Sequence, residues 1–371
     1  MFDLLILCSV GLEKVTIKEL KKLDIKSSKI KGGMIKARCP IDKLYKINLS
    51  VRTAERVLII IGEFIAENFD DLYEKTYRLN WEDYIYDNSK VVIDKLRSSN
   101  SKLFALTSIQ SVIQKAIYEK LTSYYKKSSM EESGSIQKVR VYIFKDKVTV
   151  GLDISGEPLH KRGYRKLIGK APMKETIAAG LILLSDWNDF SIPLFDPFCG
   201  SGTIPIEAMM YAMNYPVNIN RSFSLENLKI HEADKFNRIK KDLLEKVDYN
   251  IRPYIFGSDI EKSNIEISEK NYESLKIDKK IIFKTFDFKD LYPSTNKVGI
   301  FVTNAPFGER IGDKKAAIEI YKEISKFLVK FKGWEFCIFS SEKDTSKYLN
   351  KKYKTMNEIQ NGIIKSYFFR F

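Results

Sequence analysis

Cysteine and histidine are scarce in this chain of 371 residues. The cysteines lie far apart and none belongs to a C-x-x-C pair, so the spacing of a zinc site is missing and no disulfide framework is indicated. The histidines are too few to complete a metal site. We therefore expect no bound metal and a reducing compartment. The residues concerned are Cys8, Cys39, Cys199, Cys337, His160 and His231.

Long apolar runs are also missing. A helix that crosses a bilayer needs about 18 consecutive apolar residues, and no stretch of the sequence approaches that length. The first residues, FDLLILCSVGL, are apolar, but they include Asp3, lack a basic start and lead directly into a charged helical pattern. Such a stretch is typical of a buried strand and turn, and it differs from a signal peptide. We predict a cytoplasmic protein that does not interact with membranes.

Acidic residues are outnumbered by basic ones. The chain has 48 Asp and Glu against 63 Lys and Arg, which gives a formal net charge of +15. An excess of this size favours a polyanionic partner, because bound lysines and arginines release counterions from it. A lysine-rich genome would produce the same excess, so the charge alone does not decide between these two explanations.

The length predicts two or three domains. Residues 1–60 alternate strand and helix patterns as in a small α+β unit of the ferredoxin-like kind. Residues 61–157 contain strands, a long helix and a β-hairpin that turns at Lys145–Lys147. Residues 158–371 alternate strands with helices, which predicts a doubly wound, mostly parallel sheet of the α/β class. The ligand site of such a sheet lies beyond the carboxyl ends of its strands.

A glycine-rich turn follows one of these strands. The segment FDPFCGSGTIPIEA, residues 195–208, reads as a strand, a tight turn and the start of a helix, an arrangement that brings free backbone N–H groups to a ligand. Dinucleotide-binding proteins need G-x-G-x-x-G and an acid about 20 residues later. Here Pro205 stands at the third glycine position, the acid that ends the next strand is Asp259, and no G-K-[S/T] is present. Both phosphate-binding interpretations are therefore disfavoured.

The turn DPFCGSGT resembles motif I of class I S-adenosylmethionine-dependent methyltransferases that modify RNA bases. The resemblance implies a Rossmann-like fold in which the loop holds the methionine part of the cofactor. It also implies that Asp259 binds the ribose hydroxyls, that Asp287 binds the adenine amine and that Phe288 lies at the adenine ring. The cofactor-binding residues expected from it are Asp196, Pro197, Cys199, Gly200, Ser201, Gly202, Thr203, Asp259, Ile260, Asp287, Phe288 and Asn304. We expect Cys199 to be a packing residue.

A second turn, TNAPFGER at residues 303–310, resembles the [N/D]-P-P-[Y/F] motif of enzymes that methylate exocyclic amines, extended by GER as in 23S ribosomal-RNA guanine-N2 methyltransferases. The lone pair of such an amine is delocalised into the ring, so acceptors must take its hydrogens. The Asn304 side chain and the Ala305 carbonyl would do so, while Phe307 stacks on an extruded base. The expected catalytic residues are Asn304, Ala305, Pro306 and Phe307; Ala305 replaces the usual proline. The alternative for this turn is an ordinary strand-terminal turn.

The front half resembles a THUMP domain, an RNA-binding module, although a generic α+β unit has the same pattern. The resemblance implies phosphate contacts at Lys95, Arg97 and Lys102; otherwise these are solvated cations. Arg162 and Arg165, in the junction before the glycine turn, would contact RNA or a domain interface. Arg310 would contact RNA phosphate or a loop carboxylate, or form a surface ion pair. The predicted RNA-binding set is Lys95, Arg97, Lys102, Arg162, Arg165 and Arg310.

Taken together, the resemblances imply an S-adenosylmethionine-dependent enzyme that methylates the N2 amine of guanine in structured RNA, with ribosomal RNA ahead of transfer RNA. Adenine N6 is the alternative target, because the same turn serves both amines. A catalytically silent RNA-binding protein is the alternative of another class, and the THUMP-like half disfavours a DNA methyltransferase. His231 lies in a basic insert and is expected to be a surface residue at a helix start.

Overall fold

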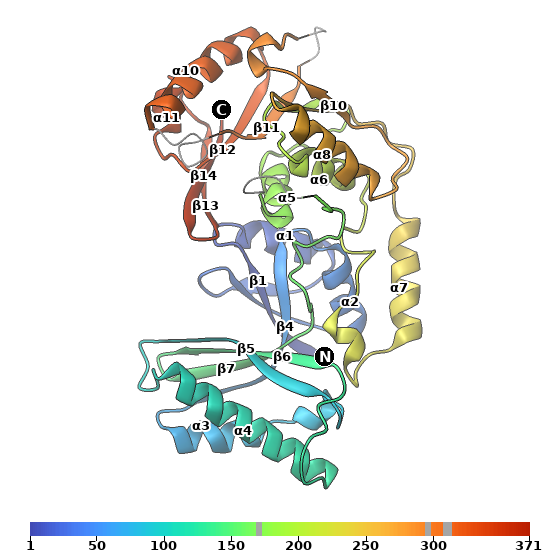
Figure 1. Ribbon diagram of the computed structural model, residues 1–371, viewed down its shortest axis with the longest axis vertical. Coiled ribbons are helices and arrows are strands. Elements are labelled where there is room, and N and C mark those ends of the chain that lie inside the picture. The colour runs from blue at the N-terminus through green and yellow to red at the C-terminus, as the bar shows by residue number, and fades with distance from the viewer. Residues whose placement is uncertain (168–172, 294–297, 307–313) are drawn as a thin grey trace.

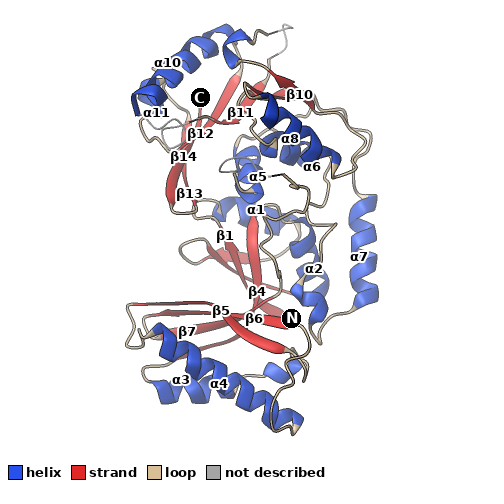
Figure 2. Cartoon of the chain, in the orientation of Figure 1, coloured by secondary structure: helices blue, strands red, loops and turns tan. Residues whose placement is uncertain are grey.

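The computed structural model describes residues 1–167, 173–293, 298–306 and 314–371, and its strands form two seven-stranded sheets (Figures 1 and 2). The first sheet comes from the front half of the chain. In spatial order it contains β2 (Ser27–Lys29), β3 (Met34–Cys39), β1 (Phe2–Cys8), β4 (Ala54–Ile65), β7 (Lys147–Asp153), β6 (Ile136–Phe144) and β5 (Lys90–Ser99). The predicted hairpin is confirmed, because β6 and β7 pair antiparallel with Phe144 opposite Lys147.

Helices pack against this sheet where its strands present buried, apolar side chains. The alternation of apolar and polar residues along each strand marks that side. On β6, Val139, Val141 and Ile143 are buried and alternate with less buried residues, as expected for a strand with one packed face. Figure 1 shows α3 and α4 against the THUMP-like part of the sheet, on its side away from the rest of the protein. The helices and the short 3-10 turn of the front half are α1 (Glu13–Lys22), α2 (Ile41–Ser50), α3 (Phe69–Tyr77), η1 (Trp81–Asp83) and α4 (Leu106–Tyr125).

Strand β4 joins the two units expected in the front half. It pairs antiparallel with β1 on one side, where Ile59 is opposite Leu4, and with β7 on the other, where Leu58 is opposite Asp153. The boundary expected between residues 60 and 61 therefore falls inside β4. Because the backbone hydrogen bonds run unbroken from β2 to β5, the two units share one sheet.

The second sheet confirms the α/β, Rossmann-like fold expected for the back half. Strands β8 to β12 are parallel to one another where they pair, and among the described strands of this sheet only β14 runs in the opposite direction, since it pairs antiparallel with both β12 and β13. Their carboxyl ends therefore meet at one edge. The order is β10 (Ile282–Thr285), β9 (Ile255–Asp259), β8 (Leu194–Asp196), β11 (Ile300–Asn304), β12 (Glu335–Ser340), β14 (Ile364–Arg370) and β13 (Thr355–Asn361).

Helices lie on both faces of this sheet (Figure 2). Its aromatic core includes Phe301, which stacks on Phe336 of the neighbouring strand with ring centroids 5.1 Å apart. Among the described residues, no helix is both long and apolar enough to cross a membrane. The helices and 3-10 turns are α5 (Glu175–Leu184), α6 (Thr203–Ala212), η2 (Ser224–Asn227), α7 (Ala233–Glu245), α8 (Lys262–Glu273), η3 (Phe288–Asp290), α10 (Lys314–Lys330) and α11 (Thr345–Tyr348).

The β13–β14 hairpin connects the two sheets. Ser340, the last residue of β12, is opposite Tyr367, so the hairpin turn extends past the carboxyl edge of the sheet. There the Gln360 N–H donates to the Val10 carbonyl at 2.9 Å. A Cβ atom at Gly11 (φ +98°) would lie 1.9 Å from the Glu358 carbonyl oxygen, so the backbones meet at a distance that only glycine permits. The hairpin thus contacts the first unit, as Figure 1 shows.

Candidate active site

The glycine turn lies between the end of β8 and the start of α6. Gly200 and Gly202 both have positive φ, +52° and +77°, which is costly for other residues. A Cβ atom at Gly202 would lie 3.0 Å from the Ser268 Cβ, whereas one at Gly200 would meet open space. Helix α6 begins at Thr203 without a side-chain cap, so its first N–H groups are available to a ligand.

Strand β9 and helix α8 hold this turn in place. The Gly200 N–H donates to Asp259 Oδ2 at 3.0 Å, and Ser268 Oγ donates to the Gly200 carbonyl at 2.8 Å. Asn264 Nδ2 donates to Asp259 Oδ1 at 3.1 Å and fixes the carboxylate's orientation. The structure therefore brings Asp259 to the turn, as the sequence predicted. Sequence reasoning missed Ser268 and Asn264, whose only signal was their polar character on the inner side of an amphipathic helix.

Asp196 connects the glycine turn to the second predicted turn. Its Oδ1 accepts from Thr303 Oγ1 at 2.6 Å and from the Phe198 N–H at 3.2 Å. Burial raises the Asp196 pKa to about 7, against the lowering effect of the hydrogen bonds from Thr303 and Phe198. Since Thr303 precedes Asn304 at the end of β11, the two turns lie side by side at one sheet edge.

Asn304 presents an unsatisfied acceptor at this edge. Its Oδ1 atom is buried and has no hydrogen-bond partner within the part of the chain that the structure describes. A buried amide oxygen without a donor costs about 1–3 kcal/mol, and a catalytic role is one of the recognised explanations for such a group. Ala305 is fully buried and Pro306 partly so. Phe307 and Arg310, also expected in this turn, lie outside the described residues.

The remaining cofactor candidates lie near the same edge with different exposure. Ile260 follows Asp259 and is 66% exposed, so an apolar side chain is open to a ligand beside the carboxylate. Asp287 follows β10 and accepts from the Lys289 N–H at 3.0 Å. Phe288 is buried, with its ring 4.8 Å from that of Phe198, so little of its surface is free for an adenine ring.

The other motif I residues pack within the turn, and the cofactor contacts expected of them stay a prediction. Pro197 and Cys199 are buried, and Ser201 Oγ lies 3.4 Å from Thr203 Oγ1. Burial raises the pKa of the Cys199 thiol well above its usual value, which agrees with a packing role and makes a thiolate nucleophile unfavourable.

The position of Arg162 contradicts its predicted role in RNA binding. Its side chain is fully buried and donates to the Leu159 and Arg52 carbonyls, with Glu207 and Asn218 also in contact. The prediction that Arg162 binds RNA is wrong, because no part of the side chain reaches the surface. The alternative, a domain interface, is what the structure shows, since Arg52 belongs to the first unit.

Arg165 stabilises the glycine turn through hydrogen bonds. Its Nη2 donates to the Met173 carbonyl at 2.7 Å and to Thr203 Oγ1 at 2.8 Å, and its Nη1 lies 3.4 Å from Glu175. These contacts direct the guanidinium inwards, with 12% of the side chain exposed. An RNA contact for Arg165 remains a prediction that this inward geometry does not support.

The three cations predicted on the THUMP-like part differ in their surroundings. Lys95 and Arg97 are exposed and line a cavity beside the first unit. Lys102 does not line it and forms an ion pair with Glu67. Among the described residues, no cluster of histidine, cysteine and carboxylate side chains could hold a metal ion.

Comparison with known proteins assigns each part of the chain to a protein family or domain family. Residues 162–368 match the family model described as RMKL-like, methyltransferase domain, and this match covers more than half of the chain. The chain belongs to the RMKL-like methyltransferase family. Residues 3–58 match the RlmL ferredoxin-like domain and residues 66–153 match the THUMP domain. The resemblances to a THUMP domain and to an S-adenosylmethionine-dependent methyltransferase are thereby confirmed.

The relatives of this RMKL-like chain include proteins from several bacteria. The Bacillus subtilis protein named "Putative RNA methyltransferase YpsC" is 34% identical over all of this chain and 96% of its own length. The ribosomal RNA large subunit methyltransferase K/L of Psychromonas ingrahamii is 30% identical over 96% of this chain, which spans about half (49%) of that relative. The crystal structure of SMU.472, described as "a putative methyltransferase complexed with SAH", is 33% identical with a TM-score of 0.92, covering 100% of this chain and 97% of that one.

Proposed function

We propose that this RMKL-like methyltransferase transfers a methyl group from S-adenosylmethionine to the exocyclic N2 amine of a guanine in structured RNA, with ribosomal RNA ahead of transfer RNA. The observation that carries the proposal is the buried Oδ1 of Asn304 beside the glycine turn, which has no hydrogen-bond partner among the described residues. The names of the relatives, an RNA methyltransferase and a ribosomal-RNA methyltransferase, support RNA as the substrate.

The residues at the glycine turn fit S-adenosylmethionine. Free N–H groups at the start of α6 suit the carboxylate of its methionine part, and the open space beside Gly200 permits close approach of a ligand to the backbone. The Asp259 carboxylate suits vicinal ribose hydroxyls, and exposed Ile260 suits one face of the adenine. The cofactor supplies a methyl group activated by a sulfonium.

Asn304 would act on the target amine. Its Oδ1 would accept one amine hydrogen and the Ala305 carbonyl the other, which draws the nitrogen lone pair out of the ring and directs it at the methyl group. Holding the two reactants in line would provide most of the rate. The nitrogen–carbon bond would form as the carbon–sulfur bond of the sulfonium breaks, which leaves S-adenosylhomocysteine. The methylated nitrogen would then release its extra proton to water. The Thr303–Asp196 hydrogen bond positions the end of β11 for this task.

The test uses the full-length protein, S-adenosylmethionine labelled on the methyl group and ribosomal and transfer RNA from a strain in which the gene is deleted. Mass spectrometry of nucleosides should show label in N2-methylguanosine. Label in N6-methyladenosine would replace guanine by adenine as the target, and no label in any RNA would support the catalytically silent alternative.

Asn304→Ala should lower turnover by at least about 100-fold while calorimetry shows unchanged S-adenosylmethionine affinity. Asn237→Ala, a change of the same type at an exposed position in α7, is the control and should keep full turnover. Full turnover in Asn304→Ala would remove Asn304 from the catalytic role.

A further inference from the structure

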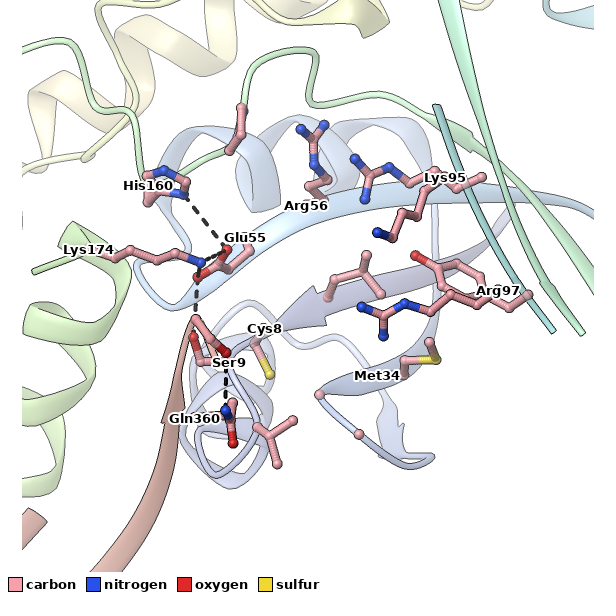
Figure 3. A pocket seen from close by; sticks show the side chains of 18 residues that line it. Cys8, Ser9, Met34, Glu55, Arg56, Lys95, Arg97, His160, Lys174 and Gln360 are labelled. Carbon is pink, nitrogen blue, oxygen red and sulfur yellow. Dashed lines mark hydrogen bonds and ion pairs between the residues drawn. The ribbon is translucent and has the colours of Figure 1, made fainter. Parts of the chain in front are cut away.

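A cleft of about 430 Å³ lies between the first unit and the catalytic domain, residues 162–368. Its walls come from α1 and α2 of the first unit and from α5, α6 and α7 of the catalytic domain. It shares no lining residue with the cavity of Lys95 and Arg97, which is drawn in Figure 3. We name it the α6 cleft. Its volume is within the range of sites that take one small molecule.

The α6 cleft lies at the far end of α6 from the glycine turn. Helix α6 begins at Thr203, next to that turn, whereas Tyr211, near the last residue of the helix, lines the cleft. At 1.5 Å per residue, the two ends of this helix of 10 residues are about 15 Å apart. The cleft is therefore separate from the proposed cofactor site.

Positive charge predominates in the α6 cleft. Five permanent cations line it against two carboxylates, Glu19 and Asp24. The Glu19 carboxylate is already engaged, because it accepts from the backbone N–H groups of Arg52 at 2.8 Å and of Thr53 at 3.0 Å. Asp24 is exposed. The cations are Lys22, Lys43, Lys46, Arg52 and Lys246.

Three of these lysines have no carboxylate partner. Lys22, Lys46 and Lys246 form no ion pair with any residue that the structure describes. They come from α1, from α2 and from the residue that follows α7, so both domains contribute. Cations that gather in a cleft without counterions raise the local positive potential, and an anion placed between them is attracted.

Arg52 adds a donor that lacks an acceptor. The residue is only 7% exposed, and its Nη2 donates to the carbonyls of Met210 at 3.0 Å and Tyr215 at 2.8 Å, near the carboxyl end of α6. Its Nη1 is buried and has no hydrogen-bond partner among the described residues. A buried donor without an acceptor is unfavourable. Since Arg52 lines the cleft, an anion bound there would supply the missing acceptor.

The cleft also has an apolar wall that comes from both domains. Leu23 and Val51 line it on the side of the first unit, and Leu183 and Leu243 on the side of the catalytic domain. An inorganic ion would leave these side chains in contact with water, whereas the carbon atoms of an organic ligand would cover them.

Phosphate suits the cationic part of the cleft better than a carboxylate does. A phosphate monoester carries a charge of about −1.5 to −2 at pH 7 and has several acceptor oxygens. It can therefore accept from a guanidinium and from lysines on different helices at the same time.

We propose that the α6 cleft binds the phosphate monoester of a small organic molecule, with Arg52 and the lysines around the phosphate and the apolar wall against the organic part. Such a ligand would connect cations of the first unit with cations of the catalytic domain and would stabilise the contact between them. This site goes beyond the proposed function, and its occupation does not depend on methyl transfer.

The test measures binding to the full chain by calorimetry. The probes are uridine monophosphate and glucose 6-phosphate, which contain neither adenine nor guanine and so do not compete for the proposed cofactor and target-base sites. Uridine, glucose and inorganic phosphate are the comparison ligands. At least one of the two phosphate esters should bind more tightly than its phosphate-free counterpart and than inorganic phosphate, and it should raise the temperature of unfolding.

The double variant Lys22→Ala/Lys246→Ala should bind that ester at least about tenfold more weakly. Both residues are exposed, so the fold should be kept. Lys18→Ala/Lys241→Ala is the matched control, because it removes the same charge from exposed positions of α1 and α7 outside the cleft, and it should bind the ester like wild type.

A third variant should change affinity in the opposite direction. Asp24→Asn removes the exposed carboxylate of the wall and should strengthen binding by up to about fivefold. Asparagine tolerates the positive φ of residue 24, +53°, so the backbone need not change.

The proposal is overturned if neither ester binds more tightly than its phosphate-free counterpart, or if the cleft variant and its control bind the ester equally well. Inorganic phosphate that binds as tightly as the esters would overturn the organic part of the ligand. If the cleft variant loses affinity for a labelled single-stranded RNA but keeps its affinity for the esters, the cleft is an RNA contact and the small-molecule site falls. None of these outcomes bears on methyl transfer, which the labelling of RNA tests separately.

Discussion

Replacing Glu55 by glutamine should weaken the contact between the first unit and the catalytic domain in a pH-dependent way. Glu55 lies on β4, yet its partners lie near the start of α5. Its carboxylate accepts from Lys174 Nζ at 2.9 and 3.0 Å and from Thr176 Oγ1 at 3.1 Å, and it also accepts from Ser9 Oγ at 3.2 Å. The side chain is 18% exposed, so these charges are only weakly screened.

The magnitude follows from the Glu55 pKa. Burial alone would raise this pKa, but the contacts with His160, 3.7 Å away, and with Lys174 outweigh it and lower the pKa from its ordinary 4.5 to about 2. Each unit corresponds to about 1.4 kcal/mol, so the ionised carboxylate stabilises the folded protein by about 3 kcal/mol at neutral pH. Because the folded-state pKa is the lower one, this stabilisation is present above about pH 4.5 and is lost as the pH falls towards 2.

The assay is urea unfolding followed by tryptophan fluorescence at pH 7 and pH 4. Glu55→Gln should be about 3 kcal/mol less stable than wild type at pH 7, and the difference should shrink by about 1 kcal/mol at pH 4. Glu157→Gln is the control, since Glu157 and its partner Lys161 are both more than half exposed and such a pair contributes at most about 1 kcal/mol. A pH-independent difference, or one no larger than the control's, would refute the reasoning.

Two further predictions concern buried charges. Burial raises the Asp196 pKa from 3.8 to about 7, so the wild type should lose stability as the pH rises from 4 to 7. Asp196→Asn keeps the acceptor for Thr303, and its stability relative to wild type in thermal unfolding should increase by about 3 kcal/mol as the pH rises from 5 to 8. Parallel pH profiles for the two proteins would contradict this. Arg162→Ala leaves buried Glu207 without its guanidinium partner and should cost about 3–5 kcal/mol by urea unfolding. A loss below 1 kcal/mol would show that the buried pair does not hold the interface.

The edge proposed as catalytic could be located from the sequence alone. The order of the elements along the chain and the residues at the strand ends are enough to locate it. A glycine turn after β8, an acid at the end of β9 and a polar turn after β11 must meet at one edge once the strands are parallel. Asp196, Asp259 and Asn304 could therefore be placed without coordinates. What the pattern could not give was the hydrogen bond from Thr303 to Asp196, because a threonine in an apolar strand has no distinctive signal.

The interfaces between the parts of the chain were beyond sequence reasoning. The resemblance of its segment to the family leaves open whether Arg162 contacts RNA or a domain interface, because its actual partners, Glu207 and Arg52, are distant in sequence. The direction of the Lys95 side chain depends on a shift of strand register that neither composition nor hydrophobic periodicity predicts. In both cases tertiary contacts determine which side chains of a segment are exposed to solvent.

The pairing of strand β4 with both front units limits how they can move relative to each other. It is hydrogen-bonded to the ferredoxin-like unit through β1 and to the THUMP domain through β7, so bending between the two would break a continuous ladder. Both units should therefore behave as one rigid arm, which the contacts of Arg162 and of the hairpin turn hold against the catalytic domain. RNA held by the THUMP domain would then lie at a fixed distance from the edge proposed as catalytic, so that a nucleotide would be selected by its distance along the RNA as well as by the identity of its base.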